Sequence, residues 1–324
     1  VSGLPLLLDR SLMATLGDFT SPDRLRELVD YLTEGGRQNH RFENFALHNI
    51  STWILAGGFP KGDMRIFGYP SDNPYYVFFI EECDPHLQVR TPSAGHNRVI
   101  LKKSLSAVLK MLTPELEKHG KLLLETDTTV RAMFFELQRE GAPFETVYAN
   151  GYFYPFFMDE EQKEKIKQME FEAPEGFRID GFDIAKDYKT VHEVWPFRAL
   201  SPPEIVRCRL EHLPSVCIRA DEGCLASWDM SHSFGQVSHL FTLEPYRGKG
   251  IGLCASNLLA QHFARTGLQV YKYVVDTNVA VVKGTMKHPL WSTWKSLKNG
   301  KESDDNQEDI MWSFNLFNYR RKEE

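Results

Sequence analysis

The second half of the chain alternates short apolar runs, typical of buried strands, with segments in which apolar residues recur at helical spacing. The helical spacing predicts helices over residues 185–194, 203–210 and 252–265. The apolar runs predict strands over 177–179, 215–220, 224–230, 236–243, 269–275 and 309–317. Because this order does not repeat a strand and a helix evenly, it predicts a mixed α/β fold and argues against a barrel or a Rossmann sheet.

The first half also alternates helices with strands. Ser21 followed by Pro22 is typical of a helix start, and the apolar residues that follow keep helical spacing. Further patterns predict a strand over 75–80, a helix around 105–112, a strand over 122–124 and a helix over 128–138. The aromatic stretch 144–157 lacks the interleaved basic residues of a base-stacking platform, so it predicts paired strands that fill a core.

A charged run separates the two halves. Residues 159–170 contain eight charged and only two apolar side chains, so this run buries little. We place the domain boundary here and expect domains over residues 1–160 and 171–324. An ordinary surface helix within one domain is the alternative.

Length and charge narrow the class of protein. The 324 residues predict about two domains. With 38 basic and 44 acidic residues the formal net charge is −6, so no overall field favours nucleic acid or an anionic membrane, and we expect neither partner. No apolar run approaches the roughly 18 residues of a membrane helix.

Cysteine usage favours a reducing compartment. Five cysteines are scattered and odd in number, and the first residues lack the pattern of a secretory signal. We therefore expect a cytoplasmic protein, with the mitochondrion as the alternative. Cys83 and His86 offer two metal ligands without a second pair, so we expect no metal.

The most informative segment is the turn 247–252, with the sequence Arg-Gly-Lys-Gly-Ile-Gly. A strand precedes it and an apolar helical stripe follows. Glycines let successive amides converge, and a helix amino terminus carries about half a positive charge, so this turn suits a phosphate or pyrophosphate. It matches neither a Walker loop nor a dinucleotide fingerprint. A tight strand-to-helix turn without a ligand is the alternative.

In this context the chain resembles the Gcn5-related N-acetyltransferase superfamily, whose Arg/Gln-x-x-Gly-x-Gly/Ala signature fits Arg247, Gly250 and Gly252. Within it, the segments 223–251 and 276–280 resemble the glycine N-acyltransferase branch. The resemblance covers about 177–290 and implies a mixed, mainly antiparallel acyltransferase fold. The first half resembles that branch only in size and alternation, which suggests a degenerate second copy.

The resemblance implies acyl-CoA binding in a V-shaped cleft between the strands 236–243 and 269–275. Acetyl-CoA or another acyl-CoA is the expected co-substrate. The residues that the resemblance assigns to CoA are Leu240, Phe241, Thr242, Arg247, Gly248, Lys249, Gly250, Ile251, Gly252, Leu253 and Asn278. For Asn278, a plain helix cap is the alternative.

Catalytic residues are harder to assign. The branch has a glutamate base eleven residues before the arginine, and that position is Gln236, whose amide cannot take up a proton. Ser238, on the same strand face, could relay a proton through water. His239 has a suitable ordinary pKa of about 6.5, but it points to the other face unless a bulge re-aims it. The tyrosine acid of the family is not evident after Asn278.

The sequence thus predicts an N-acyltransferase that moves an acyl group from CoA to a small-molecule amine, an amino acid such as glycine being one candidate, by direct attack. A peptide or protein amine is a second kind of acceptor. Because Gln236 replaces the glutamate, the alternative function is a catalytically silent CoA-binding sensor or scaffold. We expect the Cys254 side chain to pack in the core and not to act in catalysis. The sequence leaves the oligomeric state open.

Overall fold

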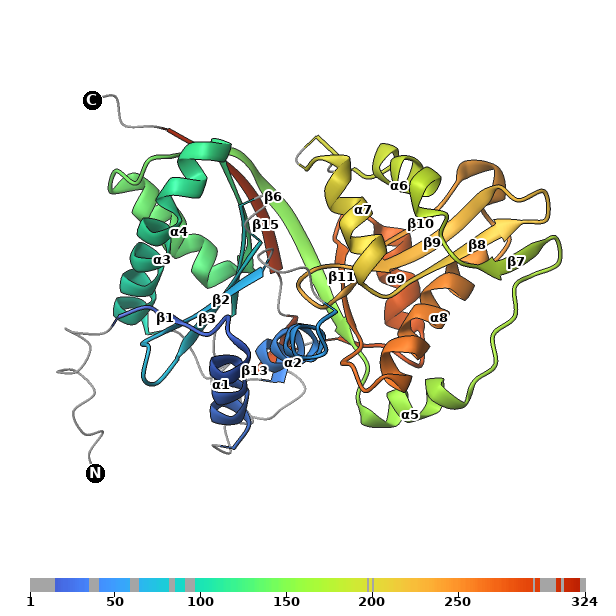
Figure 1. The fold of residues 1–324 in the computed structure, drawn as a ribbon, viewed down its shortest axis with the longest axis horizontal. Helices are drawn as coiled ribbons and strands as arrows, with labels where there is room; N and C mark the ends of the chain where they lie inside the picture. Colours follow the sequence, from blue (N-terminus) through green and yellow to red (C-terminus); the bar gives the residue numbers. More distant parts are fainter. Residues whose placement is uncertain are drawn as a thin grey trace. The chain divides into compact units, whose positions relative to one another are not determined.

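The computed structural model describes residues 15–34, 41–58, 64–81, 85–90, 97–196, 198–199, 201–293, 295–297, 307–309 and 312–320. The chain forms two compact units (Figure 1). Unit 1 comprises residues 1–44, 61–153 and 311–324, and unit 2 comprises residues 45–60 and 154–310. These ranges differ from the expected 1–160 and 171–324 chiefly in the chain's last strand, which lies in unit 1. Cys83 lies outside the described residues.

Unit 1 consists of a sheet and helices. Its strands are β1 (Gly17–Asp18), β2 (Met64–Tyr69), β3 (Tyr76–Glu81), β4 (His86–Arg90), β5 (Lys121–Asp127), most of β6 (Phe144–Phe157) and β15 (Trp312–Tyr319). Its helices are α1 (Pro22–Glu34), α3 (Arg98–His119) and α4 (Thr128–Arg139). The strand order is β1-β2-β3-β4-β5-β15-β6, antiparallel except that β4 and β5 are parallel.

The expectation of paired strands within 144–157 is wrong, because the stretch forms the single strand β6. Its partner in unit 1 is β15, which pairs with β5 on one side and β6 on the other. Strand β15 buries Phe317 between Phe134 of α4 and Phe144 of β6. Aromatic content predicts a strand, but the partner comes from the far end of the chain.

Unit 2 contains the better predicted elements. Its helices are most of α2 (Arg41–Leu55), α5 (Glu160–Gln168), α6 (Ile184–Glu193), α7 (Pro203–His212), α8 (Ile251–Arg265) and α9 (Val279–Lys287). Its strands are β7 (Phe177–Asp180), β8 (Ser215–Ala220), β9 (Leu225–Ser231), β10 (Val237–Thr242), β11 (Tyr271–Val275), β12 (Ser292–Thr293), the end of β6, and the hairpin β13 (Lys295–Leu297) with β14 (Gln307–Asp309). The order in the main sheet is β6-β11-β10-β9-β8-β7.

Two apolar clusters lie on opposite faces of β8 and β9. On one face, Trp228 packs with residues of α6 and α7. On the other, Ile218 packs against Ile251 and Ala255 of α8. Figure 1 shows α8 running along β8, β9 and β10. Alternation of side chains along each strand therefore decides which residues face α8 and which face α6 and α7.

The charged run forms α5, a surface helix of unit 2. Asp159 caps it through a capping box with Gln162. Gln261 of α8 donates hydrogen bonds to the carbonyl oxygens of Ile166 and Met169, which ties α5 to α8. None of the described helices combines the length and apolar character needed to cross a bilayer.

Candidate functional site

The glycine turn leads from the end of β10 into α8. After a short 3₁₀ turn at Glu244–Tyr246, Gly248 and Gly250 have φ angles of 76° and 79°, a left-handed conformation that favours glycine. Gly250 is the N-cap of α8, and no side chain caps the helix there. A Cβ at Gly252 would lie 2.8 Å from Oγ1 of Thr242, so this glycine allows α8 to approach β10 closely. The exposed turn thus leaves the first amides of α8 without a side-chain acceptor.

The two basic residues of the turn pack against neighbouring aromatic rings. The guanidinium of Arg247 lies 5.5 Å from the centre of the Phe241 ring, and its Nε donates to the carbonyl oxygen of Thr242 at 3.1 Å. Nζ of Lys249 lies 5.4 Å from the centre of the Phe177 ring. Both side chains remain exposed, so their positive charges add to that of the helix terminus.

Strands β10 and β11 form a parallel pair with one register contact, Val237 with Lys272. After this contact β10 continues to Thr242 and β11 to Val275, and no further register pair joins them in the described residues. We call this divergence the unit 2 fork. A fork of this kind presents strand-edge groups that an extended ligand can meet with hydrogen bonds.

A bulge interrupts β10 inside the fork. The pairing with β9 shifts between Ser238 and Phe241, and His239 has a φ of 67°, the single left-handed non-glycine among the described residues. The ring of His239 lies 4.7 Å from that of Trp195, which follows α6. The bulge therefore turns His239 toward the face of the sheet that α6 and α7 cover. His239 then lies on the same face as Gln236 and Ser238.

The electrostatics of His239 disfavour a proton-accepting role. Burial and the positive charge of Arg209 lower its pKa to about 3. Arg209 is 5% exposed and its Nε donates to Oγ of Ser233 at 3.0 Å. At neutral pH His239 is uncharged, and its buried Nδ1 has no hydrogen-bond partner. A base this weak cannot take a proton from an ammonium group.

Gln236 is 4% exposed, and its buried Oε1 has no hydrogen-bond partner. An amide oxygen in this state is a ready acceptor for an N–H group, since burying it unpaired costs about 1–3 kcal/mol. Ser238 lies half-buried two residues further along β10. This face of the sheet thus offers hydrogen-bond acceptors but no group that takes up protons at neutral pH among the predicted residues.

On the opposite face the fork contains two charged residues that sequence reasoning missed. Asp229 of β9 is 1% exposed, and burial raises its pKa. Burial lowers the pKa of Lys272 on β11, and the negative charge of Asp229 opposes that change. Nζ of Lys272 lies 4.1 Å from the centre of the Trp291 ring. The sequence did contain a signal for this pair, because each charged residue lies within a mostly apolar strand. Only the folded sheet, however, brings β9 and β11 to either side of β10.

Helix α9 follows β11. Oδ1 of Asn278 accepts a hydrogen bond from the Val281 amide at 3.5 Å, so this side chain caps the helix. Thr285 is the hydroxyl-bearing residue of α9, and its side chain is buried. Cys254 is also buried, its pKa is raised by burial, and its Sγ contacts the carbonyl oxygen of Glu172.

The remaining predicted CoA residues follow the turn and the bulge. Leu240 lies in the bulge and is exposed, whereas Phe241 stacks on Trp228 with ring centres 5.4 Å apart. Ile251, the first residue of α8, is buried, and Leu253 is 55% exposed. The predicted residues 240–242 and 247–253 thus lie on one stretch of chain, from the bulge to the first turn of α8.

The chain is similar to known proteins in sequence and in fold. A mouse glycine N-acyltransferase is 27% identical to the chain over 129 residues, which is 37% of this chain and 43% of that protein. No protein-family model matches the chain. A Drosophila protein of known crystal structure superimposes with a TM-score of 0.70 at 14% identity, covering 94% of this chain and 98% of that one.

A tandem GNAT protein from the clavulanic acid biosynthesis pathway superimposes with a TM-score of 0.52 at 8% identity, covering 93% of this chain and 98% of that one. The fold is that of the Gcn5-related N-acetyltransferases. The resemblance to this superfamily and to its glycine N-acyltransferase branch is thereby confirmed, as is the mixed α/β fold class. The chain matches less than half of the mouse relative's length.

Proposed function

We propose that unit 2 binds an acyl-CoA in its fork and transfers the acyl group to an amine. The observation that carries this proposal is the uncapped, left-handed glycine turn at the start of α8, beside a fork with a bulged strand. The turn suits the pyrophosphate of CoA, and the strand edge suits its extended pantetheine arm. Residues 240–242, 247–253 and Asn278 are the proposed contacts.

The acceptor amine would lie on the face with Gln236, Ser238 and His239. Gln236 and neutral His239 can accept hydrogen bonds from an amine and orient its lone pair toward the thioester. Neither removes a proton at neutral pH, so a water chain past Ser238 would carry it away. The rate of transfer should therefore rise with pH until the acceptor amine is fully neutral.

We also propose that the chain is a tandem of two related domains, with a degenerate copy in residues 1–160 and the active copy in 171–324. Unit 1 supports this, because β4 and β5 are parallel strands joined through α3, as β10 and β11 are joined through α8. A small-molecule amine such as glycine is the proposed acceptor, because the chain is similar over 129 residues to a mouse glycine N-acyltransferase.

Two measurements test the proposed function. Titration calorimetry with CoA should show binding. Release of free thiol from acetyl-CoA and from longer acyl-CoAs should depend on a primary amine. Glycine, other amino acids and a basic peptide are the acceptors to compare. Gln236→Glu should raise turnover at least tenfold because it supplies the missing base. Failure of CoA to bind would contradict the proposal.

A silent CoA-binding sensor or scaffold is the second candidate, favoured by Gln236 and by the low pKa of His239. It predicts CoA binding without turnover with any acceptor, and no gain from Gln236→Glu. A gain with that variant but no activity in the wild type would indicate a catalytic site that has lost its base.

A further inference from the structure

Two charged side chains on the α8 face of the fork, buried Asp229 and half-buried Lys272, have no part in the function proposed above. Val237 pairs with Ser231 of β9 and with Lys272 of β11, so these three side chains share a face. Asp229, two residues before Ser231, points to that same face. Asp229 and Lys272 therefore lie on the strands on either side of β10, on the face toward α8.

Lys272 stands at the closed end of the fork. Its contact with Val237 is the last register pair before the strands diverge, and the bulge of β10 begins at the next residue, Ser238. The adjacent Trp291 is buried and lies under Nζ of Lys272. A thioester that enters between the strands would reach the ammonium group at this end.

We propose that Lys272 donates a proton to the sulfur of CoA as the thiolate leaves, with Asp229 as the positioning residue that keeps the ammonium charged. This inference rests on the proposed function. It assigns a proton donor to a site in which the family's tyrosine acid is not evident after Asn278. The amine nitrogen forms a bond to the thioester carbon, and the C–S bond breaks with its electron pair on sulfur. Nζ of Lys272 protonates the sulfur and later regains the proton that the acceptor nitrogen loses, through water.

The acidity of Lys272 suits this transfer. An ordinary lysine has a pKa of about 10.4, and a thiol has one of about 8.5. Burial lowers the pKa of Lys272 toward that of the thiol, and proton transfer is most effective when the two values are close. The charged groups that act on Lys272 are Asp229 of β9 and, after α9, His288, whose pKa is lowered by burial and by the lysine charge. Ser256 of α8 donates to Asp229.

The test follows the ultraviolet absorbance of the CoA thiolate in the complex between about pH 6 and 10, a range that includes the ordinary thiol pKa. In the wild type, bound CoA should have a thiol pKa about one unit below that of free CoA, because a positive charge stabilises the thiolate. Lys272→Met should remove this shift. Lys272→Arg should keep it but lower turnover at least tenfold, since an arginine does not give up its proton.

Lys283→Met is the matched control, because Lys283 is an exposed lysine on the neighbouring helix α9. The double variant Asp229→Asn with Lys272→Met avoids an unpaired buried charge, and it should show the unshifted thiol if either single variant fails to fold. An identical thiol pKa in the wild type and in Lys272→Met would overturn this inference and leave the proposed function standing. Absence of CoA binding would overturn both.

Discussion

The two units contain the same local arrangement, a pair of parallel strands joined through a helix, but the pair is closed in unit 1 and open in unit 2. Strands β4 and β5 stay in register over three successive pairs, from His86 with Leu123 to Gln88 with Glu125. Strands β10 and β11 have one such pair. The strand edge that a ligand could use is therefore occupied in unit 1 and available in unit 2.

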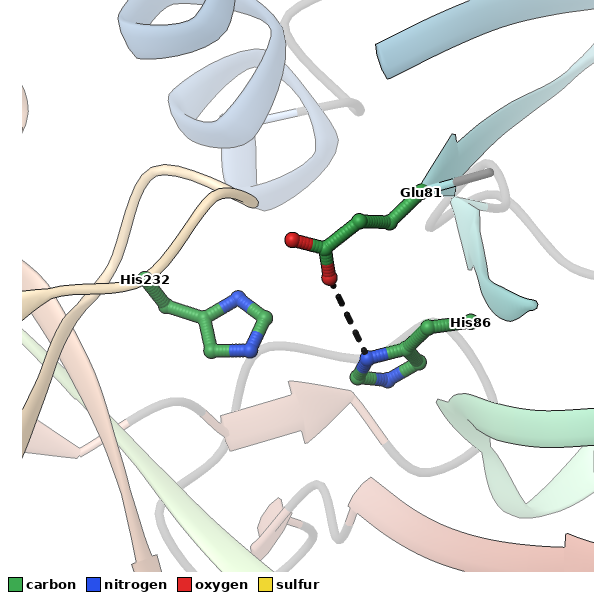
Figure 2. Close-up of side chains that lie close together, drawn as sticks. All are labelled: Glu81, His86 and His232. Atoms are coloured by element: carbon green, nitrogen blue, oxygen red, sulfur yellow. Dashed lines mark ion pairs between the residues drawn. The ribbon is translucent and has the colours of Figure 1, made fainter. Parts of the chain in front are cut away.

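Buried polar side chains reinforce the closure in unit 1. Nε2 of Gln88 donates to Glu125 at 2.7 Å, and His86 lies between Glu81 and Glu125 at 3.9 and 3.6 Å. Figure 2 shows the carboxylate of Glu81 facing the ring of His86. The hydrogen bond from Gln88 to Glu125 links β4 to β5, whereas β10 and β11 diverge in unit 2.

The amino termini of the two connecting helices, α3 in unit 1 and α8 in unit 2, also differ. Asn97 caps α3 in an extended conformation, and its side chain accepts hydrogen bonds from the amides of Val99 and Ile100. Gly250 caps α8 in a left-handed conformation without any side-chain acceptor. One helix terminus is satisfied by its own chain, and the other has free amides for an anion. The comparison favours the proposed CoA site in unit 2 over an equivalent site in unit 1.

The largest expected effect comes from Gly250→Glu. The new carboxylate would stand where the pyrophosphate is proposed to bind, so CoA affinity should fall at least 100-fold, about 2.7 kcal/mol. Gly267→Glu is the control, because Gly267 is also left-handed, has open space around it and follows the other end of α8. Titration calorimetry should give one CoA per wild-type chain. Tight binding that persists in Gly250→Glu would contradict the proposal that this turn holds the pyrophosphate.

A smaller effect is expected when a contact that holds β4 and β5 together in unit 1 is removed. Gln88→Leu would remove the hydrogen bond that Gln88 donates to the buried Glu125 carboxylate, so the free energy of unfolding should fall by about 1–3 kcal/mol. CoA affinity should not change, because the proposed site lies in unit 2. Urea unfolding and calorimetry on the same samples measure both quantities. A parallel loss of CoA affinity would break the comparison.

The bulge of unit 2 gives a pH effect. The pKa of His239 is about 3 in the folded protein and about 6.5 in the unfolded chain, so the unfolded chain binds more protons between these values. Stability should therefore fall as pH drops from about 6.5 toward 3, by at most about 1.4 kcal/mol per pH unit from this residue. His239→Asn, which tolerates the left-handed conformation, should flatten the pH dependence of Tm. An unchanged slope would contradict the shift.

The smallest effects are expected at two helix caps. Asn97→Ala should lower the free energy of unfolding by about 1 kcal/mol, because two hydrogen bonds are lost. Asn278→Ala loses one longer bond, at 3.5 Å, and should cost less. If Asn278 also contacts the pantetheine arm, its variant raises the KM for acyl-CoA, whereas Asn97→Ala leaves KM unchanged. Equal KM values would reduce Asn278 to a cap.

Much of unit 2 could be predicted from local pattern. The strand 215–220 and the helices near 203–210 and 252–265 depend on the spacing of apolar residues, and their glycines and prolines mark the ends. The glycine turn of the candidate site was likewise visible, because its conformation depends on residues that follow one another. The bulge was not, since a bulge is defined by the register of β10 against β9.

The sequence by itself determined the local conformations of this protein: where helices and strands form, and a glycine turn that only small residues can adopt. Tertiary structure decided that β15 completes unit 1, that β10 and β11 diverge, and that Asp229 and Lys272 share one face. The physical reason is that these features depend on contacts between residues distant in sequence. Their energies come from burial and pairing, which no single segment encodes.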